Sequence, residues 1–244
     1  MKKYIFLFIT LFCLSLFITL FCLSVSSQSV IGAWERSYLS EEGEKLTSVV
    51  IFSEGYQVIS IFKSDSGEFV YSNGGTWSLN GDIMTEKVEF DTGNPERVGS
   101  EVSFKVIVDE RTLSLPENDR KWNRIDDGNP GELQGAWLMA GRVRDGKKRL
   151  RDTSGPRKTM KLLSGTRFQW IAYNIETKMF MGTGGGTYTT IDGKYTENIE
   201  FFSRDNSKAG LSLEFNYLIE DDEWNHSGFS SKGDPLHEIW VIRK

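Results

Sequence analysis

Residues Gly184–Phe201 read GGGTYTTIDGKYTENIEF and predict a β-hairpin. Two runs rich in Thr, Tyr and Ile flank the dipeptide Asp192-Gly193. This dipeptide suits a type I′ turn, because both central residues of that turn need a positive φ angle. The stretch therefore predicts two antiparallel strands joined by a tight turn.

A second copy of this pattern occurs earlier in the chain. Residues Gly74–Phe90 read GGTWSLNGDIMTEKVEF, and several of its residues recur in the later stretch at one offset. The matched pairs are Thr76 with Thr187, Thr85 with Thr196, Glu86 with Glu197, Glu89 with Glu200 and Phe90 with Phe201. The turn dipeptides, Asn80-Gly81 and Asp192-Gly193, indicate a slip of one residue at the tip. We interpret the repeat as one module used twice.

Further landmarks support the duplication in the same order along the chain. Each module opens on Gly-Ala-Trp, ending at Trp34 and Trp137, and closes on a strand with Trp followed shortly by Arg124 or Arg243. Between these landmarks, residues 56–60 match residues 168–172. Turn formers fill the stretch from Asp126 to Gly131 and indicate a linker. The predicted organisation is a signal peptide (1–27), a first module (28–126), a linker (127–131) and a second module (132–244).

Both modules show the alternation of a half-buried strand. In the first module every second residue is apolar at Val102, Phe104, Val106 and Val108. In the second module the same alternation includes Leu211, Leu213, Phe215, Tyr217 and Ile219. Apolar residues at every second position indicate a sheet with one buried face. We expect roughly eight short strands per module, and an antiparallel meander of that size hides its edges best by closing into a barrel.

The N-terminus reads as a targeting segment. Lys2 and Lys3 precede an apolar run that extends to about Val25, and Ser26-Ser27 offer small residues for cleavage before Gln28. We therefore expect export through the inner membrane to the periplasm or the exterior. The run is also long enough to span a bilayer, so a retained membrane anchor is the alternative.

Composition excludes several function classes. Cys13 and Cys22 both lie in the targeting segment, so the predicted mature chain has no disulfide or thiol chemistry. The net charge of −5 makes general nucleic-acid binding a poor fit. His226 and His237 have no third ligand nearby in sequence, which argues against a zinc site. No Gly-Lys-Ser/Thr follows the glycines at 184–186 and no Gly-x-Ser-x-Gly occurs, so neither a phosphate loop nor a nucleophilic hydrolase is indicated. We expect no cofactor and no metal.

The Gly-x-Trp on the first strand and the Arg on the last resemble the lipocalin (calycin) signature. In that family the Arg covers the Trp at the closed end of an eight-stranded up-and-down barrel, and the open end takes small apolar ligands. The resemblance pairs Trp34 with Arg124 and Trp137 with Arg243 as structural residues. The second module also resembles small lipocalin-like domains of secreted bacterial proteins, mostly of unassigned function. They share its Gly-Thr-Tyr-Thr hairpin, its Thr-Glu-x-Ile-Glu-Phe strand and its terminal His-Glu-Ile-Trp-x-x-Arg strand. The resemblance therefore implies a tandem of lipocalin-like barrels.

Two glutamates are expected to point into the barrels. Alternation places Glu197 on one face with Tyr195, Ile199 and Phe201, and Glu86 on the same face as Phe90 in the first copy. A buried carboxylate is costly unless a partner satisfies it. Glu86 and Glu197 are therefore either scaffold residues with an internal partner or polar anchors for a ligand head group.

A basic segment follows the second Gly-Ala-Trp. It is either a solvated, mobile loop or an anion-contacting rim for lipid head groups, acidic glycans or the other module's acidic loop. The expected rim residues are Arg142, Arg144, Lys147, Lys148, Arg149 and Arg151.

The favoured function is non-catalytic binding of a small, partly apolar or amphipathic ligand in the second barrel. Aromatic-lined concave sites with few polar groups are the common form of such pockets. The expected lining is Phe168, Trp170, Tyr188, Tyr195, Phe215 and Trp224, with Glu197 as a polar contact. Two alternatives stay open: a protein- or glycan-interaction or inhibitor module with filled barrels, and a cofactor-free barrel isomerase or cyclase that uses Glu197.

Overall fold

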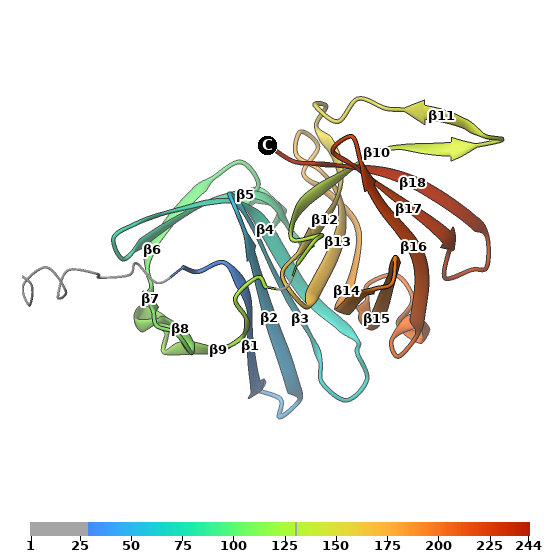
Figure 1. Cartoon of the computed structure of the whole chain (residues 1–244). Helices are drawn as coiled ribbons and strands as arrows, with labels where there is room; N and C mark the ends of the chain where they lie inside the picture. The colour runs from blue at the N-terminus through green and yellow to red at the C-terminus, as the bar shows by residue number, and fades with distance from the viewer. Residues whose placement is uncertain (1–28, 130) are drawn as a thin grey trace, which may run out of the picture.

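The computed structural model describes residues 29–129 and 131–244, and these form two antiparallel β-barrels side by side (Figure 1). The predicted targeting segment and its cleavage point lie outside the described residues. Barrel 1 comprises strands β1–β9 and barrel 2 comprises β10–β18. The predicted fold class, two consecutive up-and-down barrels, is confirmed.

Barrel 1 is a nine-stranded sheet in the order β6-β5-β4-β3-β2-β1-β9-β8-β7. β7 follows β6 after the single residue Val106, so the two ends of the sheet meet and the ring closes. The strands are β1 (Gly32–Leu39), β2 (Lys45–Ser53), β3 (Tyr56–Lys63), β4 (Phe69–Asn80), β5 (Ile83–Asp91), β6 (Glu101–Lys105), β7 (Ile107–Val108), β8 (Thr112–Leu115) and β9 (Arg120–Asp126), with 3-10 helices η1 (Pro95–Arg97) and η2 (Pro116–Asn118).

Barrel 2 closes through β10, which pairs with both β12 and β18. The outer half of β10 also pairs with β11, and this hairpin projects from the barrel as an arm (Figure 1). The strands are β10 (Gly135–Arg144), β11 (Lys147–Leu150), β12 (Arg157–Leu163), β13 (Arg167–Asn174), β14 (Met179–Ile191), β15 (Lys194–Phe202), β16 (Ser212–Glu220), β17 (Glu223–Phe229) and β18 (Pro235–Ile242), with the 3-10 helix η3 (Asn206–Lys208).

The organising hairpin forms as predicted. Asp192 and Gly193 have φ angles of 51° and 75°, as a type I′ turn requires. The equivalent turn in barrel 1 is Gly81-Asp82, because Asn80 pairs with Ile83. The expected one-residue slip between the two turns is therefore wrong, and both hairpins have two-residue loops.

Strand register corrects a second alignment. Gln57 pairs with Gly75, and Phe168 pairs with the equivalent Gly186. The structural counterpart of Gln57 is thus Phe168, one position away from the expected Gln169. Because side chains alternate between the two faces of a sheet, the expected alignment matched inward residues of one strand with outward residues of the other.

A bulge in each hairpin redirects the phenylalanines that end its second strand. The register shifts between Gly74 and Gly75 and again between Gly185 and Gly186. Phe90 and Phe201 were expected inside the barrels beside the glutamates, but the bulge places both in the contact between the barrels.

The barrels share one apolar cluster, here called the inter-barrel core. It joins outer-face residues of β1–β5 to those of β10–β15, and Phe62 stacks on Phe201 with ring centroids 5.0 Å apart. Its buried members are Ala33, Val49, Ile51, Val58, Phe62, Phe90, Ala136, Leu138, Met160, Leu162, Ile171, Tyr173 and Phe201. Each barrel also has its own interior cluster, built around Trp34 and Trp122 in barrel 1 and around Trp137 and Trp224 in barrel 2.

The stretch expected to be a linker is tied to both barrels. The Asp126 carboxylate at the end of β9 accepts five hydrogen bonds. Their donors are the backbone amides of Gly128, Gly165 and Thr166 and the hydroxyls of Ser164 and Thr166. The end of barrel 1 is thereby joined to the β12–β13 turn of barrel 2.

Candidate functional site

The Trp–Arg pair that the resemblance implied forms in barrel 1. Trp34 pairs across the strands with Arg124, whose guanidinium carbon lies 3.9 Å from the centroid of the indole ring. Arg124 also donates to the carbonyl oxygens of Ile31 (3.0 Å) and Ser29 (2.8 Å). The Trp34 indole donates to the carbonyl of Val30 at 2.9 Å. These contacts place Trp34 and Arg124 together at the start of β1.

Barrel 2 departs from the signature by one residue. The residue opposite Trp137 is Ile242, so the expected pairing of Trp137 with Arg243 is wrong. Arg243, which directly follows β18, reaches barrel 1 and donates two 2.8 Å hydrogen bonds to the Glu89 carboxylate. Tyr173 donates to the same carboxylate at 2.5 Å. Arg243 therefore joins the two barrels instead of covering one end of its own.

A cavity of about 360 Å³ lies inside barrel 2 and contains most of its buried charge. Lys161 on β12 donates to Glu197 on β15 at 2.6 Å, and their side chains are 6% and 7% exposed. The Lys161 ammonium also lies 5.0–5.2 Å from the ring centroids of Tyr195, Trp224 and Trp240. A cation held by aromatic faces and one carboxylate is well compensated for its burial.

A second group of polar side chains crosses β17, β18 and β10. His226 pairs in register with Glu238, and Glu238 with Arg142. Arg142 donates to the Glu238 carboxylate at 3.1 Å, and His226 Nδ1 lies 3.7 Å from its other oxygen. Burial raises the pKa of Glu238, but the His226 ring, Lys161 and Arg142 outweigh burial and lower it to about 2. Glu238 is therefore ionised at neutral pH.

His226 lines the same cavity, although the sequence did not single it out as a site residue. Its side chain is 3% exposed, and neither ring nitrogen has a hydrogen-bond partner within residues 29–129 and 131–244. Burial, followed by the nearby Lys161 charge, lowers its pKa to about 4, so the ring is neutral at neutral pH. The lone histidine carried no sequence signal, since only the register places it against Glu238.

The expected aromatic lining is partly wrong. Trp170, Phe215 and Glu197 line the barrel 2 cavity, as predicted. Phe168, Tyr188, Tyr195 and Trp224 do not line it, because they fill the packed interior cluster with Trp137. That cluster closes one end of the barrel, so the cavity occupies only part of its length. The ligand-contacting role of the predicted lining residues stays a prediction.

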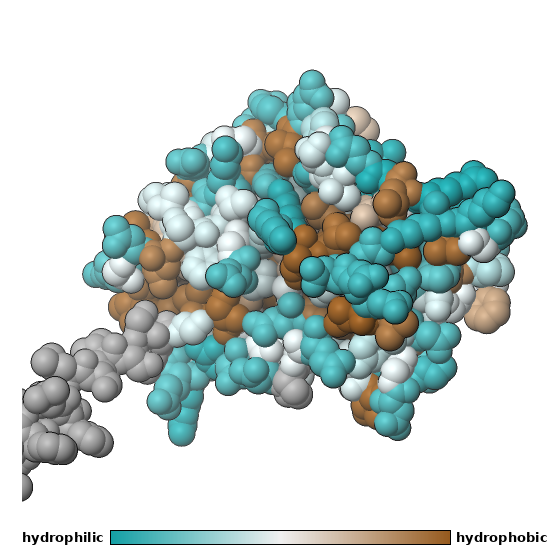
Figure 2. All heavy atoms as spheres, turned by 45° about the horizontal axis from the view of Figure 1, so that its top comes forward, coloured by the Kyte–Doolittle hydropathy of each residue, from teal (hydrophilic) through white to brown (hydrophobic). Residues whose placement is uncertain are grey.

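The basic segment divides into two parts. Arg142 and Arg151 line the cavity, together with Arg157 and Arg204. The expected rim residues Arg144, Lys147, Lys148 and Arg149 belong to the β10–β11 arm and do not line the cavity. Lys148 on the arm pairs with Glu223. Figure 2 shows a hydrophilic arm projecting at the right, where Figure 1 places this hairpin. The segment therefore forms a β-hairpin and contributes two exposed arginines to the cavity lining.

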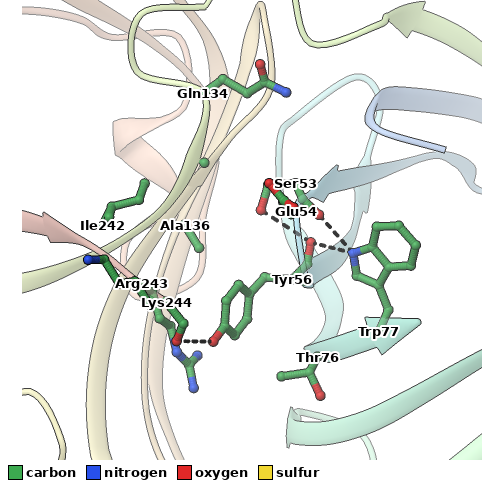
Figure 3. Close-up of a pocket in the computed structure, with 12 residues that line it drawn as sticks. Ser53, Glu54, Tyr56, Thr76, Trp77, Gln134, Ala136, Ile242, Arg243 and Lys244 are labelled. Atoms are coloured by element: carbon green, nitrogen blue, oxygen red, sulfur yellow. Dashed lines mark hydrogen bonds between the residues drawn. The ribbon is translucent and has the colours of Figure 1, made fainter. Parts of the chain in front are cut away.

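A larger hollow lies elsewhere, between the two barrels (Figure 3). It has a volume of about 830 Å³, and some of its polar groups are bonded to one another. The Trp77 indole donates to the carbonyls of Ser53 (2.9 Å) and Tyr56 (3.1 Å), and the Tyr56 hydroxyl donates to the Lys244 carbonyl at 3.2 Å. Despite its smaller volume, the barrel 2 cavity is the better candidate site, since buried charges converge there.

Two searches of the described residues returned no feature. Residues 29–129 and 131–244 contain no group of three or more His, Cys, Asp or Glu side chains that could hold a metal ion. Within the same ranges, no helix has the length and apolar character needed to cross a membrane.

Comparison with known proteins gives little functional information. No curated protein matches the chain. One similar solved structure is that of the Cpx pathway activator NlpE from Escherichia coli, at 8% identity and a TM-score of 0.26, covering 88% of this chain and 93% of that chain. A likeness this loose carries no argument. Residues 132–243, which include all the strands of barrel 2, match the model of a family described as a domain of unknown function (DUF4488).

Proposed function

We propose that barrel 2 is a non-catalytic binding domain for a small, partly apolar ligand with an anionic end. The observation that carries the proposal is the composition of the cavity wall, in which cations outnumber carboxylates amid apolar side chains. The cations are Arg142, Arg151, Arg157, Lys161 and Arg204, the carboxylates are Glu197 and Glu238, and the apolar residues include Met139, Trp170, Phe202, Leu213, Phe215 and Trp240.

The carboxylates are not free to receive a cationic ligand. Glu197 is paired with Lys161, and Glu238 is paired with Arg142. Arg157, in contrast, has no salt-bridge partner within the described residues. Arg151 and Arg204 donate to the backbone carbonyls of Met139 and Met181, which leaves their charge uncompensated. Guanidinium groups bind carboxylate and phosphate with two parallel hydrogen bonds.

The cavity also weighs against the filled-barrel alternative. A volume of about 360 Å³ lies at the lower end of ligand pockets. This size suits a ligand with a short apolar chain, which the aromatic side chains can cover. The isomerase alternative assigns the chemistry to Glu197, whose carboxylate is already bonded to Lys161.

Titration of the full mature chain with decanoate tests the proposal. Trp170 and Trp240 line the cavity, so binding should change the tryptophan fluorescence. Arg157→Gln should weaken decanoate binding by about tenfold, as expected for loss of a charge-assisted hydrogen bond. Arg144→Gln on the arm is the matched control and should leave the affinity unchanged.

Absence of decanoate binding, or equal weakening by both variants, would contradict the proposal. Native mass spectrometry of protein purified from its source adds an independent check, because a co-purifying mass begins to identify the ligand. Export stays part of the proposal, and N-terminal sequencing of the exported protein should begin near Gln28.

A further inference from the structure

A second cavity lies inside barrel 1 and has different electrostatics. Its volume is about 320 Å³, and its wall is mainly aliphatic and aromatic. Glu86 on β5 is the only carboxylate among its lining residues. The apolar lining includes Val50, Ile59, Met84, Val102, Phe104 and Trp122.

Glu86 is the counterpart of Glu197 but lacks its partner. Glu86 pairs with Trp77 in the β4–β5 hairpin, just as Glu197 pairs with Tyr188 in the β14–β15 hairpin. In barrel 2 the residue opposite Trp137 on the neighbouring strand is Lys161, whereas in barrel 1 the residue opposite Trp34 is Val50. The cation that neutralises Glu197 is therefore replaced by an isopropyl group in barrel 1.

The charged groups near Glu86 do not substitute for that cation. Arg97, which lines the cavity, is bonded to Asp91 at 2.6 Å, and the Asp91 side chain is 1% exposed. Arg120 also lines the cavity, but it is exposed and makes no ion pair with Glu86. Glu86 has neither a hydrogen-bond nor an ion-pair partner for its carboxylate within residues 29–129 and 131–244. Burial raises the pKa of Glu86 to about 7, against the opposing effect of Arg97.

We infer that the barrel 1 cavity is a second ligand site, which takes a small molecule with an apolar body and a primary ammonium group that pairs with Glu86. An ammonium group at Glu86 would supply the charge that Lys161 supplies to Glu197. The apolar wall would cover a short alkyl chain, since the volume of about 320 Å³ is at the lower end of ligand pockets. The two barrels would then prefer ligands of opposite charge.

The probe is n-octylamine, titrated calorimetrically into the full mature chain at neutral pH, with octanoate as the opposite-charge comparison. Octylamine should bind at one site, and Glu86→Gln should weaken it by at least about tenfold through loss of the charge-assisted hydrogen bond. Glu86→Gln keeps the shape of the side chain, so the thermal midpoint should confirm an intact fold. Glu101→Gln, on exposed β6, is the matched control and should leave octylamine binding unchanged.

A second variant, Val50→Lys, introduces the cation that barrel 2 already has. It should abolish octylamine binding if it folds, because an internal ammonium then occupies Glu86. Octylamine binding that persists in Glu86→Gln would overturn the inference. Loss of octylamine binding in Arg157→Gln of barrel 2 would overturn it as well, by placing the amine in the other cavity. Failure of decanoate to bind leaves these readouts intact, so the two proposals are tested separately.

Discussion

Lys161 and Val50 occupy equivalent places in the two barrels, and the difference sets the state of the glutamate beside each. Lys161 is buried and bonded to Glu197, whereas Glu86 in barrel 1 faces mainly apolar side chains. A buried carboxylate with a cationic partner stays ionised, and the fold then depends on that partner. Without a partner, burial raises the pKa of the carboxyl group.

Stability measurements should separate the two glutamates. Glu197→Gln should destabilise the protein by about 3–5 kcal/mol, because it leaves the Lys161 ammonium buried without a counter-charge. Glu86→Gln should cost little, since it removes a carboxylate whose ionised form the cavity disfavours. Urea unfolding at pH 7 measures both changes.

The double variant Lys161→Met with Glu197→Leu serves as the control for this prediction. Replacing both members of a buried pair by apolar residues is often neutral or stabilising. If the double variant is as unstable as Glu197→Gln, lost packing and not the orphaned charge explains the effect.

His226 should make stability fall on acidification. Its pKa is about 4 in the fold against an ordinary value of 6.5, so between these values the unfolded state binds more protons. Above pH 6.5 the ring is neutral in both states and costs the fold nothing. As the pH drops to 4, the free energy of unfolding falls by about 3 kcal/mol. His226→Phe, which suits the contact with Phe215, should reduce that loss in urea unfolding at pH 4.5 relative to pH 7. An unchanged pH dependence in this variant would assign the loss to other groups.

At the scale of elements, strand register decides which residues meet. The two hairpins and the Asp192-Gly193 turn were predictable because Asp-Gly and the alternation of apolar residues act locally, whereas the barrel 1 turn, Gly81-Asp82, lies one residue beyond the expected one. The partner of Arg243 was not predictable, because the final strand sits one residue away from the alignment with Arg124. The prediction that Phe201 points into the barrel was also wrong, because the bulge at Gly185 and Gly186 moves Phe201 to the other face of the sheet. The prediction that Glu197 lies inside the barrel agrees with the structure. Its partner Lys161 was not predicted, because no local pattern shows that β12 lies opposite β15.

The two bulge glycines should tolerate no side chain. A Cβ atom on Gly75 would lie 1.9 Å from the Lys87 carbonyl oxygen, and one on Gly186 would lie 2.0 Å from that of Asn198. Gly75→Ala and Gly186→Ala should each destabilise the protein by about 1–3 kcal/mol, because the hairpin backbone must separate. Thermal unfolding measures the change. Gly155→Ala, where nothing lies within 4 Å of the added carbon, is the control and should change stability by less than about 0.5 kcal/mol.

At the scale of the whole molecule, the two barrels fold around a common core. The inter-barrel core buries aromatic residues of both halves, including Phe90 and Phe201, and Arg243 adds an ion pair to Glu89 across the contact. The duplicated sequence predicted two barrels, but not that they share a core. Outward-facing apolar residues such as Ile51 and Leu162 look the same in sequence as inward-facing ones, so only the assembled sheets show which face each covers.

The isolated second barrel should be unstable despite its closed sheet. A chain of residues 132–244 would expose Leu138, Met160, Leu162, Ile171 and Phe201, which barrel 1 covers in the full chain. Burial of such side chains contributes about 1.5–3 kcal/mol each. The fragment should therefore unfold at a lower temperature than the full chain or aggregate, whereas the full chain should give one cooperative transition by calorimetry. Two separate transitions in the full chain would contradict this.

The shared core also sets a time during synthesis in which the chain is vulnerable. Barrel 1 is complete in sequence at Asp126, yet the outer wall that contains Val49, Ile51 and Phe62 stays uncovered until β15 has been made. At about 5–20 residues per second, the stretch from Asp126 to Phe201 takes on the order of 4–15 s. Through that interval the nascent first half carries an apolar sheet face that can associate with other chains, and translation speed over the second half sets how long the exposure lasts.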